Sequence, residues 1–417
     1  MKVLWITNIL FPEAESLLLK QSELRASGGW MLGAADALLR GQYDVSLSVA
    51  AVSSLVKELT VLHGQKMTYY VLPFGKGNVC PNPEFEPMWK LVNERCRPDV
   101  VHIHGTEFSH GLAFINACSE VKTVISIQGL TSVYYYYYHH GLTRNQIIQK
   151  LTLRDVLRGS ILSDKRMFRR RGEIVEIPML SKVCNVIGRT SWDKAHVWAI
   201  NPSATYYFCN ETLRSEFYDG SRWNYDTCEK YTIFLSQAGY PIKGLHQVLR
   251  AMPLILRIYP NTRIKVAGHD ITRTYSLKEK VRLSGYGKII KGMISQMHLE
   301  GHVEFLGPLN AEQMKQAYLN SNVFVCPSSI ENSPNSLGEA QLLGVPCVAS
   351  YVGGISDMMI GNEENLYRFE DIEMLAENVC RVFANKENQV DMRRKAFARH
   401  NPEENAKKLY NIYNCIK

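Results

Sequence analysis

The sequence contains no long hydrophobic run, no Cys-x-x-Cys pair and no typical secretory signal. Its 417 residues include no stretch of about 18 apolar residues, the length that a helix needs to span a bilayer. The ten cysteines are scattered, which argues against a zinc site or a disulfide framework and favours free thiols. The short apolar run 2–10 leads into Pro12 and Glu13 without a small-residue cleavage site, so we interpret it as a strand. We therefore expect a globular, cytoplasmic protein.

Short apolar runs are present throughout the chain, each followed by a turn and a helical segment. With 46% hydrophobic residues, the chain can form two to three domains of about 150 residues. Such runs, alternating with helices, are typical of parallel α/β sheets. The runs that we interpret as strands include 45–50, 68–72, 99–105, 123–130, 206–209, 231–236, 263–268, 303–309 and 323–326. The polar, irregular residues 218–230 indicate a linker between two such halves.

The stretch from Ser328 to Ser350 organises the second half of the chain. The run 323–326 predicts a buried strand, and a polar loop leads from it to a helix that opens at an N-cap, Asn335 or Ser336. The turn 344–346 closes this helix. Loops at the carboxyl ends of parallel strands bind ligands, and a helix N-terminus offers free N–H groups to an anion. We therefore expect an anion-binding cleft at this helix.

Two carboxylates flank the start of the helix. Glu331 lies in the loop and Glu339 on the helix, with seven residues between them. A simple phosphate site would not explain them, whereas a nucleotide-diphosphate sugar offers phosphates to the N–H groups and hydroxyls to the carboxylates. The alternative is a pair of solvent-exposed glutamates that interact favourably with the helix dipole.

This stretch resembles the Glu-x7-Glu motif of glycosyltransferase family 4, a family of retaining nucleotide-sugar transferases. The context of the motif matches as well: Pro327-Ser328 precedes the first glutamate, Ala340 follows the second, and the turn 344–346 and Gly353-Gly354 come later. The chain resembles in particular the members that synthesise bacterial surface polysaccharides.

The resemblance implies a GT-B fold, in which two Rossmann-like α/β domains with parallel sheets face a central cleft. Residues 1–220 would form the acceptor-side domain, residues 221–400 the nucleotide-sugar domain, and residues 401–417 a helix that crosses back to the first domain. The family resemblance implies no cofactor and no metal ion.

The resemblance also implies which residues bind the donor. Lys243 matches the lysine that neutralises the diphosphate, and Glu331 matches the glutamate that holds the sugar hydroxyls, so these two are the candidate catalytic residues. The ribose is expected at Glu339. The candidate donor-binding residues are Gly28, Gly29, Gln128, Gly307, Asn335, Ser336, Leu337 and Glu339. Taken without the family, an ordinary surface lysine is the more common interpretation of Lys243.

Two positions of the family pattern differ in this chain. The family's arginine, five residues before the lysine, falls on Ala238, and its histidine beside the donor sugar falls on Gln128. Glutamine donates and accepts hydrogen bonds but cannot act as a general base. We therefore expect Gln237 or an arginine from elsewhere to complete the phosphate site, or weaker diphosphate binding than the family usually has.

An aromatic run at 134–138 and a basic run at 165–171 form an amphipathic region of about 40 residues. Tyrosines and clustered cations suit a sugar acceptor or an anionic membrane surface. The alternatives are an irregular packed loop for the tyrosines and a solvated helix face for the basic run. The residues that we place on the acceptor or membrane side are Tyr134, Tyr136, Arg169 and Arg170.

Histidines mark the end of one predicted strand. His102 and His104 share one face of the run 99–105. Because no third ligand stands at a suitable spacing, we favour structural histidines over metal ligands. His104 and His110 are candidates to line the cleft.

We therefore expect a retaining glycosyltransferase of the hexosyltransferase type, which moves a sugar from a nucleotide-diphosphate donor to a glycan or lipid-linked glycan in surface polysaccharide synthesis. Two alternatives share the architecture: a nucleotide-sugar 2-epimerase, and a non-catalytic relative that binds nucleotide sugars. The net charge of +8 also leaves open a peripheral contact with the inner face of the membrane. No nucleic-acid partner is expected.

Overall fold

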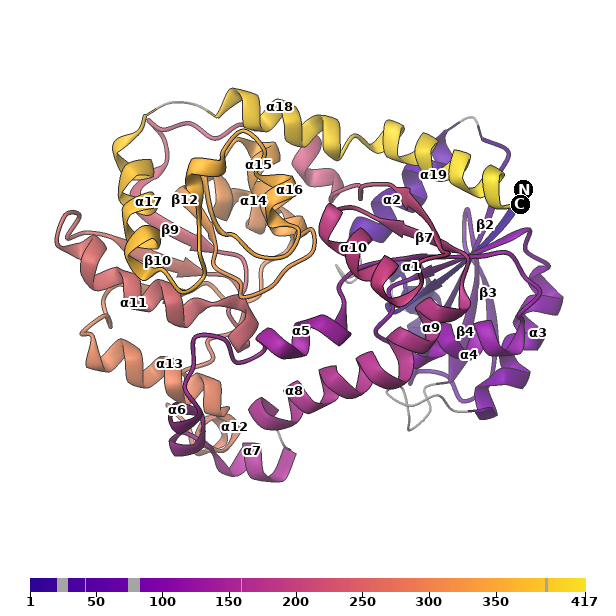
Figure 1. The fold of residues 1–417 in the computed structure, drawn as a ribbon, viewed down its shortest axis with the longest axis horizontal. Helices are drawn as coiled ribbons and strands as arrows, with labels where there is room; N and C mark the ends of the chain where they lie inside the picture. Colours follow the sequence, from indigo (N-terminus) through magenta and orange to yellow (C-terminus); the bar gives the residue numbers. More distant parts are fainter. Residues whose placement is uncertain (21–28, 42, 74–82, 159, 387–388) are drawn as a thin grey trace. The chain divides into compact units, whose positions relative to one another are not determined.

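The computed structural model describes the chain except for residues 21–28, 42, 74–82, 159 and 387–388 (Figure 1). The described residues form two compact units. Unit 1 comprises Met1–Val133, Phe168–Ser215 and Arg399–Lys417, and unit 2 comprises Tyr134–Met167 and Glu216–Ala398. Because the chain passes between the units more than once, a segment's position in the sequence does not by itself assign it to a unit.

Unit 1 is built on an eight-stranded sheet with the order β3-β4-β2-β1-β5-β6-β7-β8. All neighbouring strands are parallel except β3 and β4. Residues 3–6 of the central strand β1 are fully buried, because helices cover both faces of the sheet. The strands are β1 (Lys2–Thr7), β2 (Ser46–Ser53), β3 (Thr60–His63), β4 (Thr68–Pro73), β5 (Val100–His104), β6 (Thr123–Ser126), β7 (Asn185–Gly188) and β8 (Thr205–Phe208).

The two faces of this sheet carry different helices. Helices α2 and α19 pack on one face, and α3, α4, α9 and α10 contribute to the core on the other. The helices of unit 1 are α1 (Pro12–Leu19), α2 (Gly29–Arg40), α3 (Glu86–Cys96), α4 (Ser109–Ala117), α9 (Ile177–Lys182), α10 (Ser191–Ile200) and α19 (Pro402–Ile416).

A buried chain of hydrogen bonds anchors α19 to the sheet of unit 1. Trp5 Nε1 donates to the Tyr413 hydroxyl at 2.9 Å, and that hydroxyl lies 2.6 Å from His102 Nδ1. His102 Nε2 is in turn hydrogen-bonded to Ser126 Oγ. Which ring nitrogen of His102 donates depends on its tautomer, but in either tautomer both nitrogens have a hydroxyl partner that can donate or accept. His102 is therefore a structural histidine with both nitrogens satisfied.

Unit 2 is built on a six-stranded, fully parallel sheet with the order β11-β10-β9-β12-β13-β14. Together with the sheet of unit 1, it confirms the predicted fold class of two mainly parallel α/β sheets. The strands are β9 (Glu229–Leu235), β10 (Arg263–Val266), β11 (Val303–Phe305), β12 (Ser321–Cys326), β13 (Cys347–Ser350) and β14 (Leu366–Tyr367).

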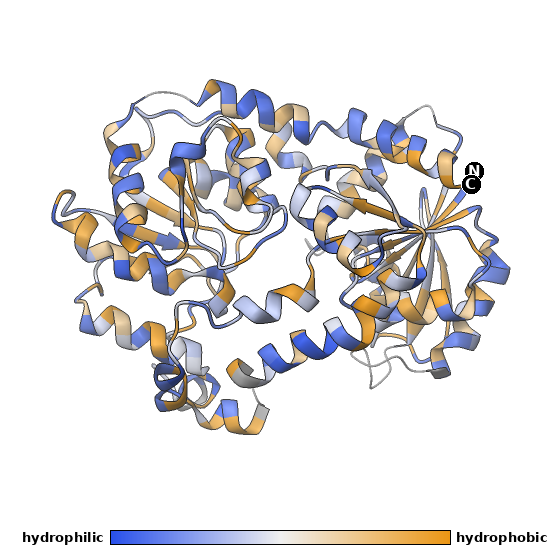
Figure 2. Cartoon of the chain, in the orientation of Figure 1, coloured by the Kyte–Doolittle hydropathy of each residue, from blue (hydrophilic) through white to orange (hydrophobic). Residues whose placement is uncertain are grey.

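Helices surround this second sheet, and two further helices, α5 (Thr131–Tyr137) and α8 (Ser160–Arg171), lead from one unit into the other. Figure 2 shows mainly hydrophobic strands inside each unit and a largely hydrophilic α8. No helix in the described part of the chain is long and apolar enough to cross a bilayer. The helices of unit 2 are α6 (Arg144–Gln149), α7 (Leu153–Arg158), α11 (Leu245–Leu256), α12 (Leu277–Arg282), α13 (Gly285–Gln296), α14 (Ala311–Leu319), α15 (Asn335–Leu343), α16 (Ile355–Met358), α17 (Ile372–Ala384) and α18 (Val390–Arg399).

Two segments of unit 2 differ from the expectation. Residues 134–167 precede the predicted boundary at residue 220, yet Ile147 and Ile161 are buried in the core of unit 2. Residues 218–230 are not a free linker, because Trp223 is buried and its indole N–H donates to the Ser321 carbonyl at 2.7 Å. Long-range packing, which the local sequence does not reveal, places both segments.

We expect Tyr413→Phe to lower the free energy of unfolding by about 1–3 kcal/mol, because Trp5 and His102 would each lose a partner in a buried site. Urea denaturation of the full chain, followed by circular dichroism and fluorescence, measures the change. Tyr410→Phe on the same helix is the control, since Tyr410 keeps its stacking on Tyr43, with ring centroids 4.6 Å apart. Equal unfolding midpoints for the two variants would contradict the role of the chain of hydrogen bonds.

Candidate functional site

The two candidate catalytic residues meet in unit 2. Lys243 ends the turn Pro241–Lys243 after β9, and Glu331 lies in the loop after the neighbouring strand β12. Lys243 Nζ lies 2.6 Å from Glu331 Oε1, and the two side chains are only 18% and 10% exposed. Ser328 Oγ donates to the same carboxylate oxygen at 2.8 Å. The carboxyl edge of the sheet therefore holds one largely buried ion pair.

The environment of Lys243 fixes its charge. Burial lowers the pKa of Lys243, but the attraction of the Glu331 carboxylate outweighs burial, so the pKa is raised above its ordinary value. Lys243 is therefore a cation at neutral pH, and the alternative of an ordinary surface lysine is wrong. Removing either partner would leave an uncompensated charge in a buried position.

The structure separates the two tyrosines that we expected on one acceptor or membrane surface. Tyr134 is half-buried, and burial followed by the Glu331 carboxylate raises its pKa. Its hydroxyl thus belongs to the surroundings of the ion pair. Tyr136 is 65% exposed. Arg169 and Arg170 are exposed on the last turn of α8, where Arg169 Nε donates to Glu173 Oε1 at 2.8 Å.

The first turn of α15 contains polar groups that have no hydrogen-bond partner within the helix. The helix begins at Asn335, but the predicted N-cap is wrong: Pro334 occupies that position, and no side chain caps the helix. The N–H groups of Leu337 and Gly338 point back to the Pro334 carbonyl at 3.0 and 3.3 Å. Those of Asn335 and Ser336 lie in the first turn, where an N–H has no acceptor within the helix. Among the described residues, the buried Oδ1 of Asn335 has no hydrogen-bond partner.

The remaining motif residues of unit 2 also occupy defined positions. Glu331 and Glu339 are only 7% and 5% exposed, so the alternative of two solvent-exposed glutamates is wrong. Gly353 has a φ of 52°, and a Cβ there would lie 1.9 Å from the Glu331 carbonyl oxygen. Only glycine therefore allows the Gly354 N–H to reach that oxygen at 3.1 Å. Beside Gly307, a Cβ would meet nothing within 4 Å, so this loop borders open space.

The positions that depart from the family pattern have different environments. Ala238 is buried in the core of unit 2 and supplies no cation. In unit 1, Gln128 follows β6; its Oε1 lies 3.4 Å from Arg189 Nη2, and its Nε2 is buried without a partner in the described chain. Gly29 begins α2, whereas Gly28 lies outside the described residues.

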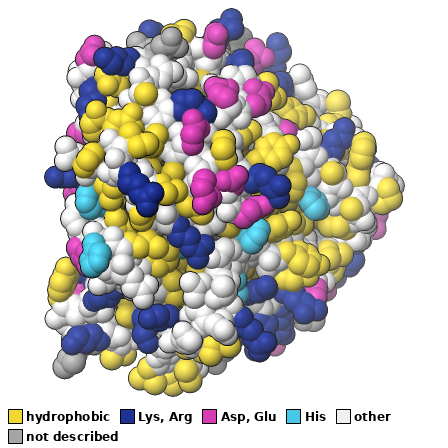
Figure 3. Space-filling model, turned by 60° about the vertical axis from the view of Figure 1, so that its left-hand side comes forward, with side chains coloured by type: hydrophobic (Ala, Val, Ile, Leu, Met, Phe, Trp, Pro, Cys, Tyr) yellow, Lys and Arg dark blue, Asp and Glu magenta, His cyan; other side chains and the backbone are white. Residues whose placement is uncertain are grey.

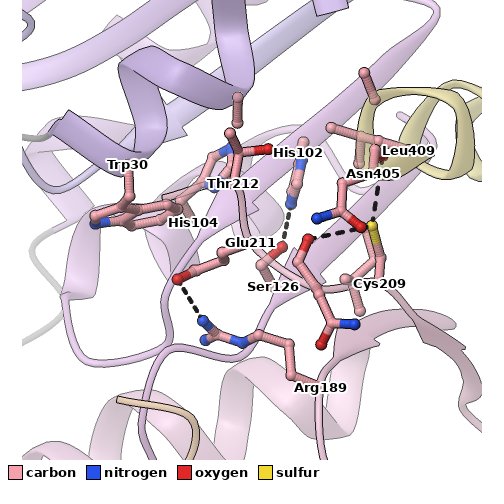
Figure 4. A pocket seen from close by; sticks show the side chains of 14 residues that line it. Trp30, His102, His104, Ser126, Arg189, Cys209, Glu211, Thr212, Asn405 and Leu409 are labelled. Atoms are coloured by element: carbon pink, nitrogen blue, oxygen red, sulfur yellow. Dashed lines mark hydrogen bonds and ion pairs between the residues drawn. The ribbon is translucent and has the colours of Figure 1, made fainter. Parts of the chain in front are cut away.

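Unit 1 has a small cavity of about 40 Å³ at the carboxyl ends of β5 to β8 (Figure 4). Its polar side includes the ion pair between Arg189 Nη1 and Glu211 Oε2, 2.6 Å apart and nearly buried. Because the two charges compensate each other, this pair adds no net charge. Other lining residues include Trp30, His104, Ser126 and Asn405.

His104 is the unusual group in this cavity. Burial lowers the pKa of His104 to about 3, so the ring is neutral. Neither of its nitrogens has a hydrogen-bond partner among the described residues, and its ring lies 5.9 Å from that of Trp30. A neutral imidazole beside an indole offers one donor and one acceptor, which suits an uncharged, hydroxyl-rich ligand.

The other histidine that we expected at the cleft lies elsewhere. His110 is on α4, stacks on Phe108 and does not line this cavity. Within the described ranges, no group of three or more His, Cys, Asp or Glu side chains could hold a metal ion.

The sequence analysis missed Trp30, Arg189 and Glu211. Arg189 directly follows β7, so the rule that pointed to Glu331, a polar residue after a parallel strand, could have identified it. Trp30 and Glu211 have no such local signal, because tertiary packing alone brings them to the cavity.

Comparison with known proteins agrees with the geometry. Residues 222–399 match the family model of glycosyl transferases group 1. An uncharacterized glycosyltransferase of Methanocaldococcus jannaschii is 30% identical over 131 residues, which are 31% of this chain and 30% of the relative. The D-inositol 3-phosphate glycosyltransferase of Corynebacterium urealyticum is 24% identical over 185 residues, which are 42% of this chain and 41% of the relative. The aligned region therefore spans less than half of each relative.

The fold matches solved structures over the full length. The sucrose-phosphate synthase of Thermosynechococcus elongatus superposes with a TM-score of 0.70 at 17% identity and covers 100% of this chain and 98% of its own. At this identity the likeness shows the fold alone, and the fold is GT-B. The matched domain contains both glutamates of the motif and Lys243. Residues 222–399 therefore form a group 1 glycosyltransferase domain, the family that the Glu-x7-Glu stretch predicted.

Proposed function

We propose that the protein is a retaining glycosyltransferase of the hexosyltransferase type, which transfers a sugar from a nucleotide-diphosphate donor to a glycan or lipid-linked glycan in surface polysaccharide synthesis. The observation that carries the proposal is the buried Lys243–Glu331 pair at the edge where α15 begins. When the bond between the sugar C1 and phosphate breaks, the electron pair stays on the diphosphate. A fixed cation and unpaired helix N–H groups stabilise that developing charge.

In this mechanism Lys243 and the N–H groups of Asn335 and Ser336 bind the diphosphate. Glu331 accepts hydrogen bonds from sugar hydroxyls, and Glu339 accepts them from the ribose. The acceptor oxygen forms the new bond to C1 on the face that the phosphate leaves, and its proton passes to the departing phosphate oxygen. The configuration at C1 is thereby retained without a protein base, which accommodates Gln128 in place of the family's histidine.

The cavity of unit 1 supports an uncharged, hydroxyl-rich acceptor group. Its Arg189–Glu211 pair is self-compensated, and its His104 is neutral with both nitrogens available. The name of one relative, a D-inositol 3-phosphate glycosyltransferase, also points to a polyol substrate. We therefore propose that the acceptor places a hydroxyl-bearing group of a sugar or polyol in this cavity.

We expect Lys243→Ala to lower kcat by about 10²–10³-fold, because one charge-stabilising group is lost in the transition state. Transfer or hydrolysis of nucleotide sugars by the purified chain measures the effect. Lys265→Ala is the control, since Lys265 also forms an ion pair, 2.7 Å from Glu229. If both variants turn over at the wild-type rate, the proposed site is wrong.

Glu331→Gln should separate diphosphate binding from sugar binding. In this variant a bound diphosphate can replace the Glu331 carboxylate as the anion beside Lys243, so nucleoside diphosphates should still raise Tm, whereas the corresponding nucleotide sugars should give no further rise. A thermal-shift panel of nucleotides with and without sugars tests this on the full chain. An unchanged extra shift from the sugar would show that Glu331 does not hold it.

The two alternative functions predict different outcomes in the same assays. An epimerised sugar formed from the donor without acceptor would support the 2-epimerase. A nucleotide-sugar thermal shift without any turnover would support the non-catalytic relative.

His104→Ala should raise the acceptor KM about tenfold, roughly the loss of one hydrogen bond, and leave the donor KM unchanged. His110→Ala is the matched control, because burial also lowers the pKa of His110, to about 4, yet it lies outside the cavity. Steady-state kinetics with a glycan acceptor separate the two constants. Equal acceptor KM values for both variants would exclude the cavity as an acceptor site.

A further inference from the structure

One face of unit 2 leaves large apolar side chains in solvent. The face is formed by α6, α7 and α12 with the residues just before α12, and we call it the α7 face. Val156 and Leu157 on α7 are each 73% exposed, and Tyr275 before α12 is 86% exposed. The exposed large hydrophobic residues of the α7 face are Ile148, Leu153, Val156, Leu157, Tyr275 and Val281.

These apolar residues belong to a folded face. Ile147 from the same segment is buried in the core of unit 2. The Asp155 side chain accepts from the Thr152 N–H at 2.8 Å, and Arg154 Nη1 donates to the Arg282 carbonyl at 2.6 Å, which ties α7 to α12. The core and these hydrogen bonds thus hold α7 in place while its remaining apolar residues point outward.

The same face is strongly basic. The segment 144–158 contains four basic residues and one acidic residue, and the segment 273–282 contains four basic residues and one acidic residue. Their combined excess of +6 is a large part of the net charge of the whole chain, +8. The acidic residue of the second segment, Glu279, pairs with Arg273 Nε at 3.2 Å. In Figure 3, the lower edge of the molecule shows hydrophobic side chains beside Lys and Arg side chains.

A polar hollow of about 590 Å³ adjoins this face. Arg154, Arg273 and Arg282 line it. Its other carboxylates are engaged: Asp164 accepts from the Tyr138 hydroxyl at 3.0 Å, and Asp270 accepts from the Thr272 N–H at 2.8 Å. Three arginine side chains therefore lie at the border of the apolar residues.

We propose that the α7 face docks on the surface of an anionic lipid bilayer. Cations attract the headgroups, and apolar side chains enter the boundary between headgroups and acyl chains. A second copy of the chain would bring like charges together, and a free anion in water would leave the apolar residues exposed. The bilayer is the one occupant that satisfies both features. This docking goes beyond the transfer reaction and does not depend on it.

The test is cosedimentation of the full chain with vesicles of phosphatidylcholine alone or with about 30% phosphatidylglycerol, a fraction chosen to give an anionic surface. We expect binding to the anionic vesicles only, weakened by added salt. The triple variant Leu153→Ser, Val156→Ser and Leu157→Ser should bind at least tenfold more weakly. The control triple variant Ile258→Ser, Met374→Ser and Val390→Ser replaces exposed apolar residues elsewhere in unit 2 and should bind like the wild type.

Several results would overturn the proposal. These are no binding to anionic vesicles, equal binding to neutral vesicles, or equal binding by the two triple variants. Millimolar glycerol phosphate that displaces the protein from vesicles would point to a site for a single soluble anion instead. A dimer in sedimentation velocity that only the α7 variant disrupts, without vesicle binding, would identify a second copy as the occupant.

Discussion

The structure of the donor side depends on one buried ion pair. A largely buried lysine is tolerable only with a compensating anion, and Glu331 supplies it to Lys243 at 2.6 Å. The pair links the loops after β9 and β12, and Gly353 lets the next loop hold the Glu331 backbone. Because Tyr134 also adjoins the pair, a segment from the first half of the sequence becomes part of this site. The charge that would bind a diphosphate is thus fixed before any ligand arrives.

In unit 1, neutral hydrogen-bonding groups support the last helix and line the cavity, whereas the candidate site of unit 2 is built on a charged pair. The chain of hydrogen bonds from Trp5 through Tyr413 and His102 to Ser126 fixes the last helix and one wall of the cavity. His104 stands beside His102, with ring centroids 3.9 Å apart, but lacks such partners. The same strand therefore carries one histidine that supports the fold and one that is available to a ligand. This contrast matches a charged donor and an uncharged acceptor.

Residues 134–167 take part in two features of unit 2, the surroundings of the ion pair and the α7 face. They follow the sheet of unit 1 in sequence and yet pack on unit 2, where Ile147 and Ile161 enter the core. One end brings Tyr134 to the ion pair, and the middle presents the basic, apolar α7 face. This one segment thus contributes both to the surroundings of the Lys243–Glu331 pair and to the surface that we propose for docking.

The sequence by itself predicted most of the strands and the fold family, and it identified Lys243, Glu331 and Glu339 as candidate site residues, because periodicity and short motifs are local properties. It did not predict β3. It predicted the wrong N-cap for α15, a position that the adjacent Pro334 occupies, and an unanchored linker at 218–230, where Trp223 instead donates to the distant Ser321 carbonyl. Only the tertiary structure showed that Tyr134 lies near the ion pair whereas Tyr136 is exposed. It also showed that Arg189 pairs with Glu211 and that residues 134–167 pack in unit 2. The physical reason is the same in each case: buried contacts between distant segments leave no periodic signal in either segment alone.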